Sequence, residues 1–251
     1  MPKRGGLAAV VIVFVLHHFQ LHMMRPYVPL YAASLDIGYL GIGVVAASLG
    51  ILPLIFALPA GSLTDRWGTR RMAVIGGATS AVGYLLLVAS PTIAFIVISQ
   101  LFAGLANLLM SLSTQAYVGS LGRGRAAERN FSLFTMFGSI GQIAGPLVGG
   151  IVVGLAGFRA AFLVAASLSI LSAVAALALL PRHQRPAGTA TSGGLSRRAW
   201  KYLRTSETRI AILTSCLMAV PEILRSAFLP LYLDSAVGLD AELVGYVLAV
   251  Y

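Results

Sequence analysis

Long apolar runs dominate this sequence and limit the folds that it can adopt. An α-helix needs about 20 mostly apolar residues to cross a bilayer, and runs of that length recur along the chain. Their expected bounds are 7–34, 39–60, 72–89, 92–118, 130–156, 158–180 and 208–234, and an eighth run begins near residue 241. Polar and apolar residues do not alternate in these runs, as they would in the strands of a lipid-facing barrel. The sequence therefore predicts an all-α membrane protein, in which each helix satisfies its own backbone hydrogen bonds.

The charged residues of the chain are few, mostly basic, and placed in alternate connections between the runs. They make up 10% of the chain, whereas a soluble domain has about a quarter, so lipid should cover most of the surface. The net charge is +10. The basic connections contain Lys3, Arg4, Arg66, Arg70, Arg71, Arg123, Arg125, Arg129, Arg182, Arg185, Arg197, Arg198, Lys201, Arg204 and Arg209. Such connections face the cytoplasm, so we expect a multi-pass plasma-membrane protein with a cytoplasmic amino terminus and no nucleic-acid partner.

The runs form two groups separated by a polar linker. We expect an N-terminal six-helix transmembrane bundle at 1–181, a cytoplasmic linker at 182–207 and the start of a C-terminal bundle at 208–251. The segment 25–31, RPYVPLY, is echoed by the segment 225–232, RSAFLPLY. Transporters made of two related halves carry repeats of this kind. We therefore expect the sequence to be truncated after the start of its second half, with the rest of that half missing.

The connection between the second and third runs carries one acid among three arginines. Residues 61–71 read G-S-L-T-D-R-W-G-T-R-R. Gly61 and Gly68 allow a close approach of helices, and the carboxylate of Asp65 would be favoured near a helix amino terminus. The segment is either a polar hinge with a conformational role or a basic cytoplasmic loop with one counter-acid.

A glycine-rich pattern lies in the fifth run. Residues 141–150 read G-Q-I-A-G-P-L-V-G-G, which is G-x-x-x-G-P-x-x-G-G. Glycines in a membrane helix let a neighbour pack against the backbone, and a proline frees a carbonyl and bends the helix. A general packing face of the G-x-x-x-G type would account for only part of this pattern. Its defining residues are Gly141, Gly145, Pro146, Gly149 and Gly150.

The two motifs, the helix count and the linker resemble the major facilitator superfamily of secondary transporters. The pattern in the fifth run resembles the antiporter motif of its drug:proton exporters. The resemblance implies the fold of that superfamily, with a complete six-helix N-terminal half and the first part of the C-terminal half. It also implies a conformational gate, in which Asp65 meets a helix of the other half and holds the cytoplasmic side closed. The gate residues are Gly61, Asp65, Arg66, Gly68 and Arg70, while Thr69 departs from the family pattern at a basic position.

Polar residues inside the runs are candidates for a central cavity. They are Arg25, His18, His22, Gln100, Asn107, Ser111, Gln115, Glu222 and Arg225. Ionisable groups at membrane depth face a cavity or a partner, so Glu222 is either a proton site or a structural partner of Arg225. The polar residues of the fourth run share a helix face, which is either a cavity wall or a source of interhelical hydrogen bonds. Gln100 stands where the drug exporters have an arginine, so that arginine's role in proton coupling does not transfer.

The sequence indicates transport and not catalysis. It contains neither a Walker pattern nor an H-E-x-x-H pattern, and we expect no catalytic residue, no cofactor and no metal. The first expectation is proton-coupled efflux of small amphipathic molecules or drugs by alternating access, with substrate, protons and membrane lipid as partners. A metabolite importer of the same superfamily is the second. A membrane interaction protein that transports nothing is the third.

Overall fold

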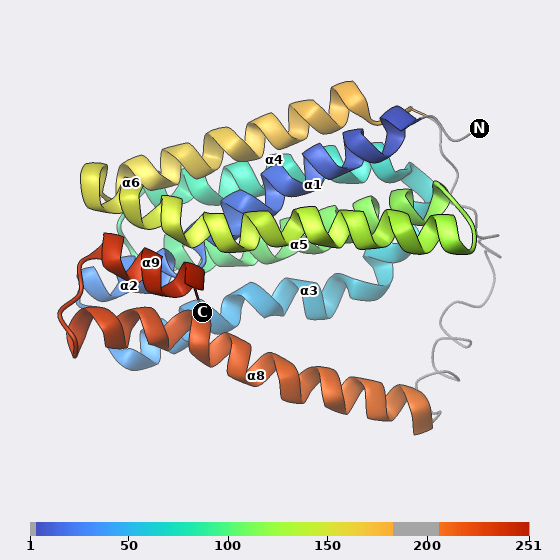
Figure 1. Cartoon of the computed structure of the whole chain (residues 1–251). Coiled ribbons are helices and arrows are strands. Elements are labelled where there is room, and N and C mark those ends of the chain that lie inside the picture. Colours follow the sequence, from blue (N-terminus) through green and yellow to red (C-terminus); the bar gives the residue numbers. More distant parts are fainter. Residues whose placement is uncertain (1–3, 183–205, 251) are drawn as a thin grey trace.

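The computed structural model describes residues 4–182 and 206–250, and it confirms the all-α prediction (Figure 1). Its helices are α1 (Arg4–Met24), α2 (Tyr27–Ser34), α3 (Tyr39–Trp67), α4 (Thr69–Ala89), α5 (Ile93–Ser120), α6 (Arg125–Leu179), α8 (Ser206–Ser235) and α9 (Ala241–Val250). Among the described residues, 5 helical stretches are long and apolar enough to cross a membrane. All of the predicted linker except its ends lies outside the described residues.

The run predicted at 7–34 is divided into two helices. α1 ends at Met24 and α2 begins at Tyr27. The last backbone hydrogen bond of α1 is donated by the amide of Arg25 to the carbonyl of Leu21, at 3.0 Å. Pro26 has no amide hydrogen with which to continue it. Pro26 therefore interrupts the helix, while Gly6–Ser34 remains one candidate membrane span, as the run predicted at 7–34 requires.

The break predicted between the fifth and sixth runs is present. α6 covers 55 residues, but Gly157 inside it has φ 78° and ψ 172°, which is not helical. Positive φ costs glycine little because it has no Cβ, so the chain can reverse direction at one residue. Figure 1 shows the two parts of α6, residues 125–156 and 158–179, lying antiparallel. Two membrane-crossing helices therefore meet at Gly157.

The connections alternate between the two ends of the bundle (Figure 1). One end holds the amino terminus, the turn at Gly68, the turn after Ser120 and the end of α6. We call it the basic end because the helix ends and connections there carry Arg66, Arg70, Arg71, Arg123, Arg125 and Arg182. The opposite end holds the α2–α3 and α4–α5 connections, Gly157 and the α8–α9 connection. The predicted basic connections thus lie together on one side as far as the structure describes them.

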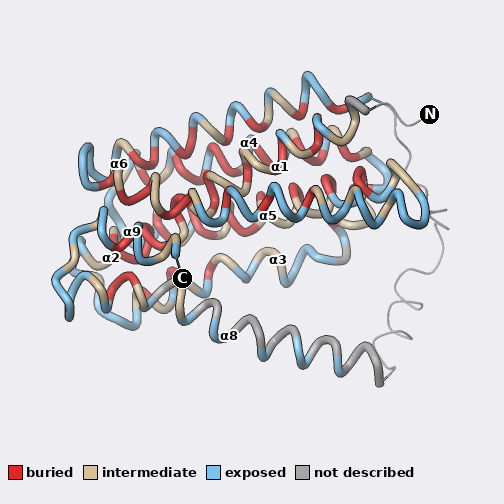
Figure 2. The backbone as a smooth tube through the Cα atoms, in the orientation of Figure 1, coloured by how far each residue is buried: buried red, intermediate tan, exposed pale blue. Residues whose placement is uncertain are grey.

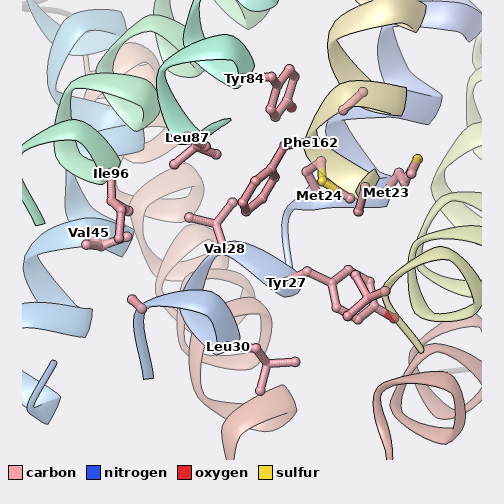
Figure 3. Packing of buried hydrophobic residues seen from close by; sticks show 14 of the residues in the cluster. Met23, Met24, Tyr27, Val28, Leu30, Val45, Tyr84, Leu87, Ile96 and Phe162 are labelled. Carbon is pink, nitrogen blue, oxygen red and sulfur yellow. The ribbon is translucent and has the colours of Figure 1, made fainter. Parts of the chain in front are cut away.

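The core forms where α1, α4, α5 and α6 face one another. Figure 2 shows buried residues concentrated along these faces, whereas α3 has more exposed surface. Figure 3 shows the packing of buried hydrophobic residues of one cluster, which include Met23, Tyr27, Tyr84 and Phe162. α1 contacts α5 and both α1 and α4 contact α6. The position of α1 at the centre of these contacts fixes which of its residues can reach a cavity.

A buried polar cluster ties α1 to α4 and to the second part of α6. The side-chain amide of Gln20 donates to the hydroxyl of Ser80 at 3.0 Å and lies 3.1 Å from Nδ1 of His17. The hydroxyl of Ser169 lies 3.3 Å from that of Ser80. Polar groups in an apolar interior require such partners, so this cluster fixes the rotation of α1 about its own axis.

Candidate functional site

A cavity of about 170 Å³ lies between the first and the last described helices. Its polar wall comes from the end of α1, from α6 and from α8. Those residues are His22, Arg25, Gln142, Arg225 and Ser226. The apolar wall comprises Pro26, Ile143, Pro146, Leu248 and Ala249. Segments before and after the linker therefore share one site. The two arginines of the sequence echo both line it, as expected for corresponding positions in two related halves.

A second cavity, of about 320 Å³, lies nearer the basic end between α1, α5 and α6. His18, Gln115 and Gln142 line it, together with Ser139 and aromatic side chains. The rings of His18 and His22 lie 5.6 Å apart between centroids. Gln142 lines both cavities, and the sequence interpretation missed it. The signal was a polar side chain at a variable position of an otherwise apolar motif.

The polar face predicted on α5 is divided between packing and cavity. Gln100 is buried, and Asn107 and Ser111 are half-buried. The Ser111 hydroxyl donates to the Asn107 side-chain oxygen at 3.4 Å. Gln115 is exposed and lines the second cavity. Of this polar face, only the part closest to the basic end therefore reaches the second cavity. Gln100 lines a separate small cavity together with Arg25 and Tyr84.

The glycine motif of α6 forms the surface against which α1 packs. All of its defining residues are buried. A methyl group added at Gly141 would lie 3.0 Å from the amide nitrogen of Phe19, and one added at Gly145 would lie 2.7 Å from that of Met23. These are main-chain atoms, which cannot rotate away. The motif therefore allows backbone-to-backbone packing beside both cavities.

Further along, the same motif also contacts α9. A methyl group at Gly150 would lie 2.6 Å from the carbonyl oxygen of Ala241. The Tyr27 hydroxyl donates to the carbonyl of Pro146 at 2.8 Å and, over a longer distance of 3.4 Å, to that of Ala241. Tyr27 thus joins α2, α6 and the start of α9 at the end opposite the basic one. The sequence interpretation quoted Tyr27 only as part of the repeat and did not identify this contact.

The gate segment is more helical than predicted. Residues 61–67 belong to α3, whose expected end was residue 60. The hydroxyl of Thr64 donates to the carbonyl of Ala60 at 2.8 Å, so polar side chains are accommodated within the helix. Gly68 alone forms the turn, with φ 82°. The prediction of a loop was therefore wrong, because a positive-φ glycine lets one residue separate two helices.

The charged gate residues lie at the surface of the basic end. Asp65 and Arg66 are exposed, and Arg70 is half-buried and donates a hydrogen bond to the carbonyl of Leu177 near the end of α6. A methyl group added at Gly61 would meet nothing within 4 Å. Asp65 is therefore exposed on α3 among the described residues, and its contact with a helix of the other half stays a prediction.

Two predictions remain to be placed: the proton site at Glu222 and the expected absence of a metal site. Glu222 lies in α8, but its side chain is outside the part of the chain that the structure describes. Among the described residues, no group of three His, Cys, Asp or Glu side chains could hold a metal ion. The proton-site hypothesis for Glu222 stays a prediction.

Comparisons with known proteins agree on one family. The sequence profile described as Major Facilitator Superfamily matches residues 10–251. An uncharacterized MFS-type transporter of Mycobacterium tuberculosis is 29% identical over 164 residues, which cover 65% of this chain and 39% of that protein. A multidrug resistance protein, Stp, of the same species is 29% identical over 132 residues, covering 52% of this chain and 25% of that protein. The chain thus spans well under half the length of these relatives.

A solved structure has the same fold. The crystal structure of the nucleoside transporter NupG superposes with a TM-score of 0.74 at 18% sequence identity, covering 98% of this chain and 63% of that one. At that identity, the similarity concerns the fold. It supports the helix arrangement described above, including the placement of α8 and α9.

Proposed function

Because the chain belongs to the major facilitator superfamily, we propose that the complete protein exports small amphipathic molecules by alternating access, coupled to protons. The complete glycine motif of α6 and the similarity to a protein named for multidrug resistance support export. The observation that carries the proposal is the cavity walled by α1 and α6 on one side and by α8 and α9 on the other. A site between two halves is what alternating access requires.

The arrangement of the two parts supports an inward-facing state. α8 contacts α2, α3 and α9, and α9 contacts α6. Figure 1 shows α8 beside the bundle at the end that holds α2 and α9, and diverging from the bundle toward Ser206. If the basic end is cytoplasmic, as the positive-inside rule predicts, the contacts among Tyr27, Pro146 and Ala241 lie on the outer side. In this interpretation the outer side is closed and the gate of Asp65 is open.

The charge of the cavity favours acidic substrates. Arg25 and Arg225 both line it, and its described lining contains no Asp or Glu. Glu222 precedes Arg225 by one helical turn, and a single carboxylate would leave at least one positive charge. Arginine pairs with carboxylates, sulfonates and phosphates through two parallel hydrogen bonds. Import of an acidic metabolite would use the same wall, and the direction of transport distinguishes it from efflux.

Proton coupling is tested with the complete protein in proteoliposomes. Naphthalenesulfonate is a permanently charged amphipathic anion. When a pH gradient is imposed, we expect it to leave the compartment that protons enter faster than it does without the gradient. Glu222→Gln should abolish this acceleration, because an amide cannot carry a proton through the cycle. Fluorescence of the released anion gives the rate. Equal rates with and without the gradient would contradict proton coupling, and movement only in the inward direction would favour the importer.

Charge selection is tested at Arg25. A hydrogen bond to a charged group contributes about 1.5–3 kcal/mol to the binding free energy. Because Arg25→Gln removes that charge, it should raise the KM for naphthalenesulfonate roughly 10- to 150-fold. The KM for the neutral naphthalenesulfonamide should change much less. Arg159→Gln is the matched control, because Arg159 is exposed at the opposite end of the bundle from the basic connections. Equal effects of Arg25→Gln on the anion and the amide would contradict a charge-selecting role.

A further inference from the structure

A groove of about 610 Å³ lies at the basic end, away from both cavities described above. It runs between the α3–α4 connection and the end of the second part of α6. Its basic residues are Arg70, Arg71 and Arg182, and its apolar residues are Trp67, Val74, Ile75 and Leu177. The proposed transport cycle uses none of these residues except Arg70.

The charge of the groove calls for an anionic occupant. Three arginines line it, and the part of its lining that the structure describes contains no Asp or Glu. Asp65, two residues before Trp67, is the nearest acid along the chain, and one carboxylate would leave at least two positive charges. Arginines gathered in one concavity bind phosphate groups through charge-assisted hydrogen bonds. A phosphate is therefore the group that the basic wall fits.

The apolar wall identifies the source of that phosphate. Trp67 is 48% exposed and Leu177 is 52% exposed. Ile75, also in the groove, and Val174, three residues before Leu177, are exposed as well and belong to the surface that lipid covers in a membrane protein. A tryptophan beside arginines at the ends of membrane helices marks the level of the lipid headgroups. A headgroup phosphate on the arginines would leave the acyl chains on this apolar surface, whereas a soluble phosphate would leave it unoccupied.

The charge of the chain's own linker makes it unsuited to occupy the groove. The sequence that follows Arg182 contains Arg185, Arg197, Arg198, Lys201 and Arg204. These basic residues would repel the arginines of the groove. An anionic lipid is attracted by both, and basic pockets between membrane helices on the cytoplasmic side are known to hold anionic headgroups.

We propose that this groove binds an anionic phospholipid, with its phosphate on Arg71 and Arg182 and its acyl chains along Ile75 and Leu177. Arg70 already bonds to the carbonyl of Leu177 and so joins the start of α4 to the end of α6. The lipid would bridge the same two helix ends through the neighbouring arginines. Phosphatidylglycerol has the required charge, and phosphatidylcholine, with its neutral headgroup, does not.

The experiment is native mass spectrometry of the complete protein released from vesicles that contain equal amounts of phosphatidylglycerol and phosphatidylcholine. We expect phosphatidylglycerol to remain bound to the wild type in preference to phosphatidylcholine. Each basic residue near a membrane surface contributes an attraction equivalent to a roughly fivefold change in binding, so Arg71→Gln with Arg182→Gln should weaken retention roughly 30-fold. Arg70 stays unchanged because it has a partner within the chain.

The control removes two other arginines from the same end. Arg123, in the α5–α6 turn, and Arg129, near the start of α6, are exposed and do not line the groove. Arg123→Gln with Arg129→Gln should retain the lipid as the wild type does. An equal loss in both double variants would overturn the proposal, since it would indicate attraction to the net charge alone. Displacement of the lipid by inorganic phosphate at millimolar concentration would also overturn it and indicate a site for a soluble anion.

Lipid retention can be distinguished from effects of the variants on folding and on transport. Thermal melting in phosphatidylcholine alone shows whether each variant is folded, and a single variant, Arg182→Gln, replaces the double one if that melts early. Its expected loss is roughly fivefold, and unchanged retention in a folded variant would contradict the assignment. Lipid retention requires no transport, so a failure of the proposed export function would leave this measurement unaffected.

Discussion

Gly145→Ala is expected to lower both the melting temperature and the yield of folded protein. The added methyl group would lie 2.7 Å from the amide nitrogen of Met23 and 3.0 Å from the carbonyl carbon of His22. Both are main-chain atoms of α1, so relief requires that the whole helix move away from α6. Overpacking of a close interface costs about 1–3 kcal/mol, and we expect the upper part of that range. The measurement is the yield of monodisperse protein and its thermal melting in detergent.

Gly154→Ala is the matched control for this substitution. Gly154 lies in the first part of α6, where an added methyl group would be 3.7 Å from the Cβ of Glu242, an ordinary contact. Alanine favours a helix over glycine by up to about 1 kcal/mol, so this variant should melt at the same temperature as the wild type or above it. Wild-type melting of Gly145→Ala would show that α1 and α6 do not pack backbone to backbone.

Much of the fold could be predicted because bilayer crossing imposes a length on each apolar run. The start of α9 at Ala241 and the reversal at Gly157 agree with the predicted positions. The helix division at Pro26 and the continuation of α3 to Trp67 did not follow from hydropathy. A proline can be accommodated within a membrane helix or divide it, and polar residues at a membrane surface can be helical or not. Tertiary contacts decide both.

The site could be predicted only in part, because a cavity depends on how helices are rotated. His22, Arg25 and Arg225 were identified by their charge or polarity in an apolar setting, and they line one cavity. Gln142 was missed because it occupies a variable position of a motif that is defined by its glycines and proline. Tyr27 was missed since its role depends on two carbonyl groups, and main-chain acceptors leave no trace in a sequence.

The gate proposed at the basic end is compatible with the same geometry. The two parts of the chain meet through Tyr27, Gly150 and Ala241 at one end, while α8 diverges at the other. For transport to proceed, the basic end must close at some point of the cycle. Asp65 is exposed on α3 there, and in the proposed gate its carboxylate meets the start of a helix of the other half. We therefore place its contribution in the closed state.

Asp65→Asn should shift the protein toward the state that is open at the basic end and slow transport. A carboxylate at a helix amino terminus contributes about 0.3–2 kcal/mol, so the ratio of open to closed molecules should rise roughly 2- to 30-fold. Labelling of a cysteine at Ser139, which lines the second cavity, measures the change after the native Cys216 is replaced. Asp36→Asn is the control: Asp36 is exposed at the opposite end with φ 57°, which asparagine also tolerates. Should Asp65→Asn label and transport like this control, Asp65 would be a counter-charge of a basic surface and would not hold the gate, because the carboxylate would then be no more favourable in the closed state than in the open one.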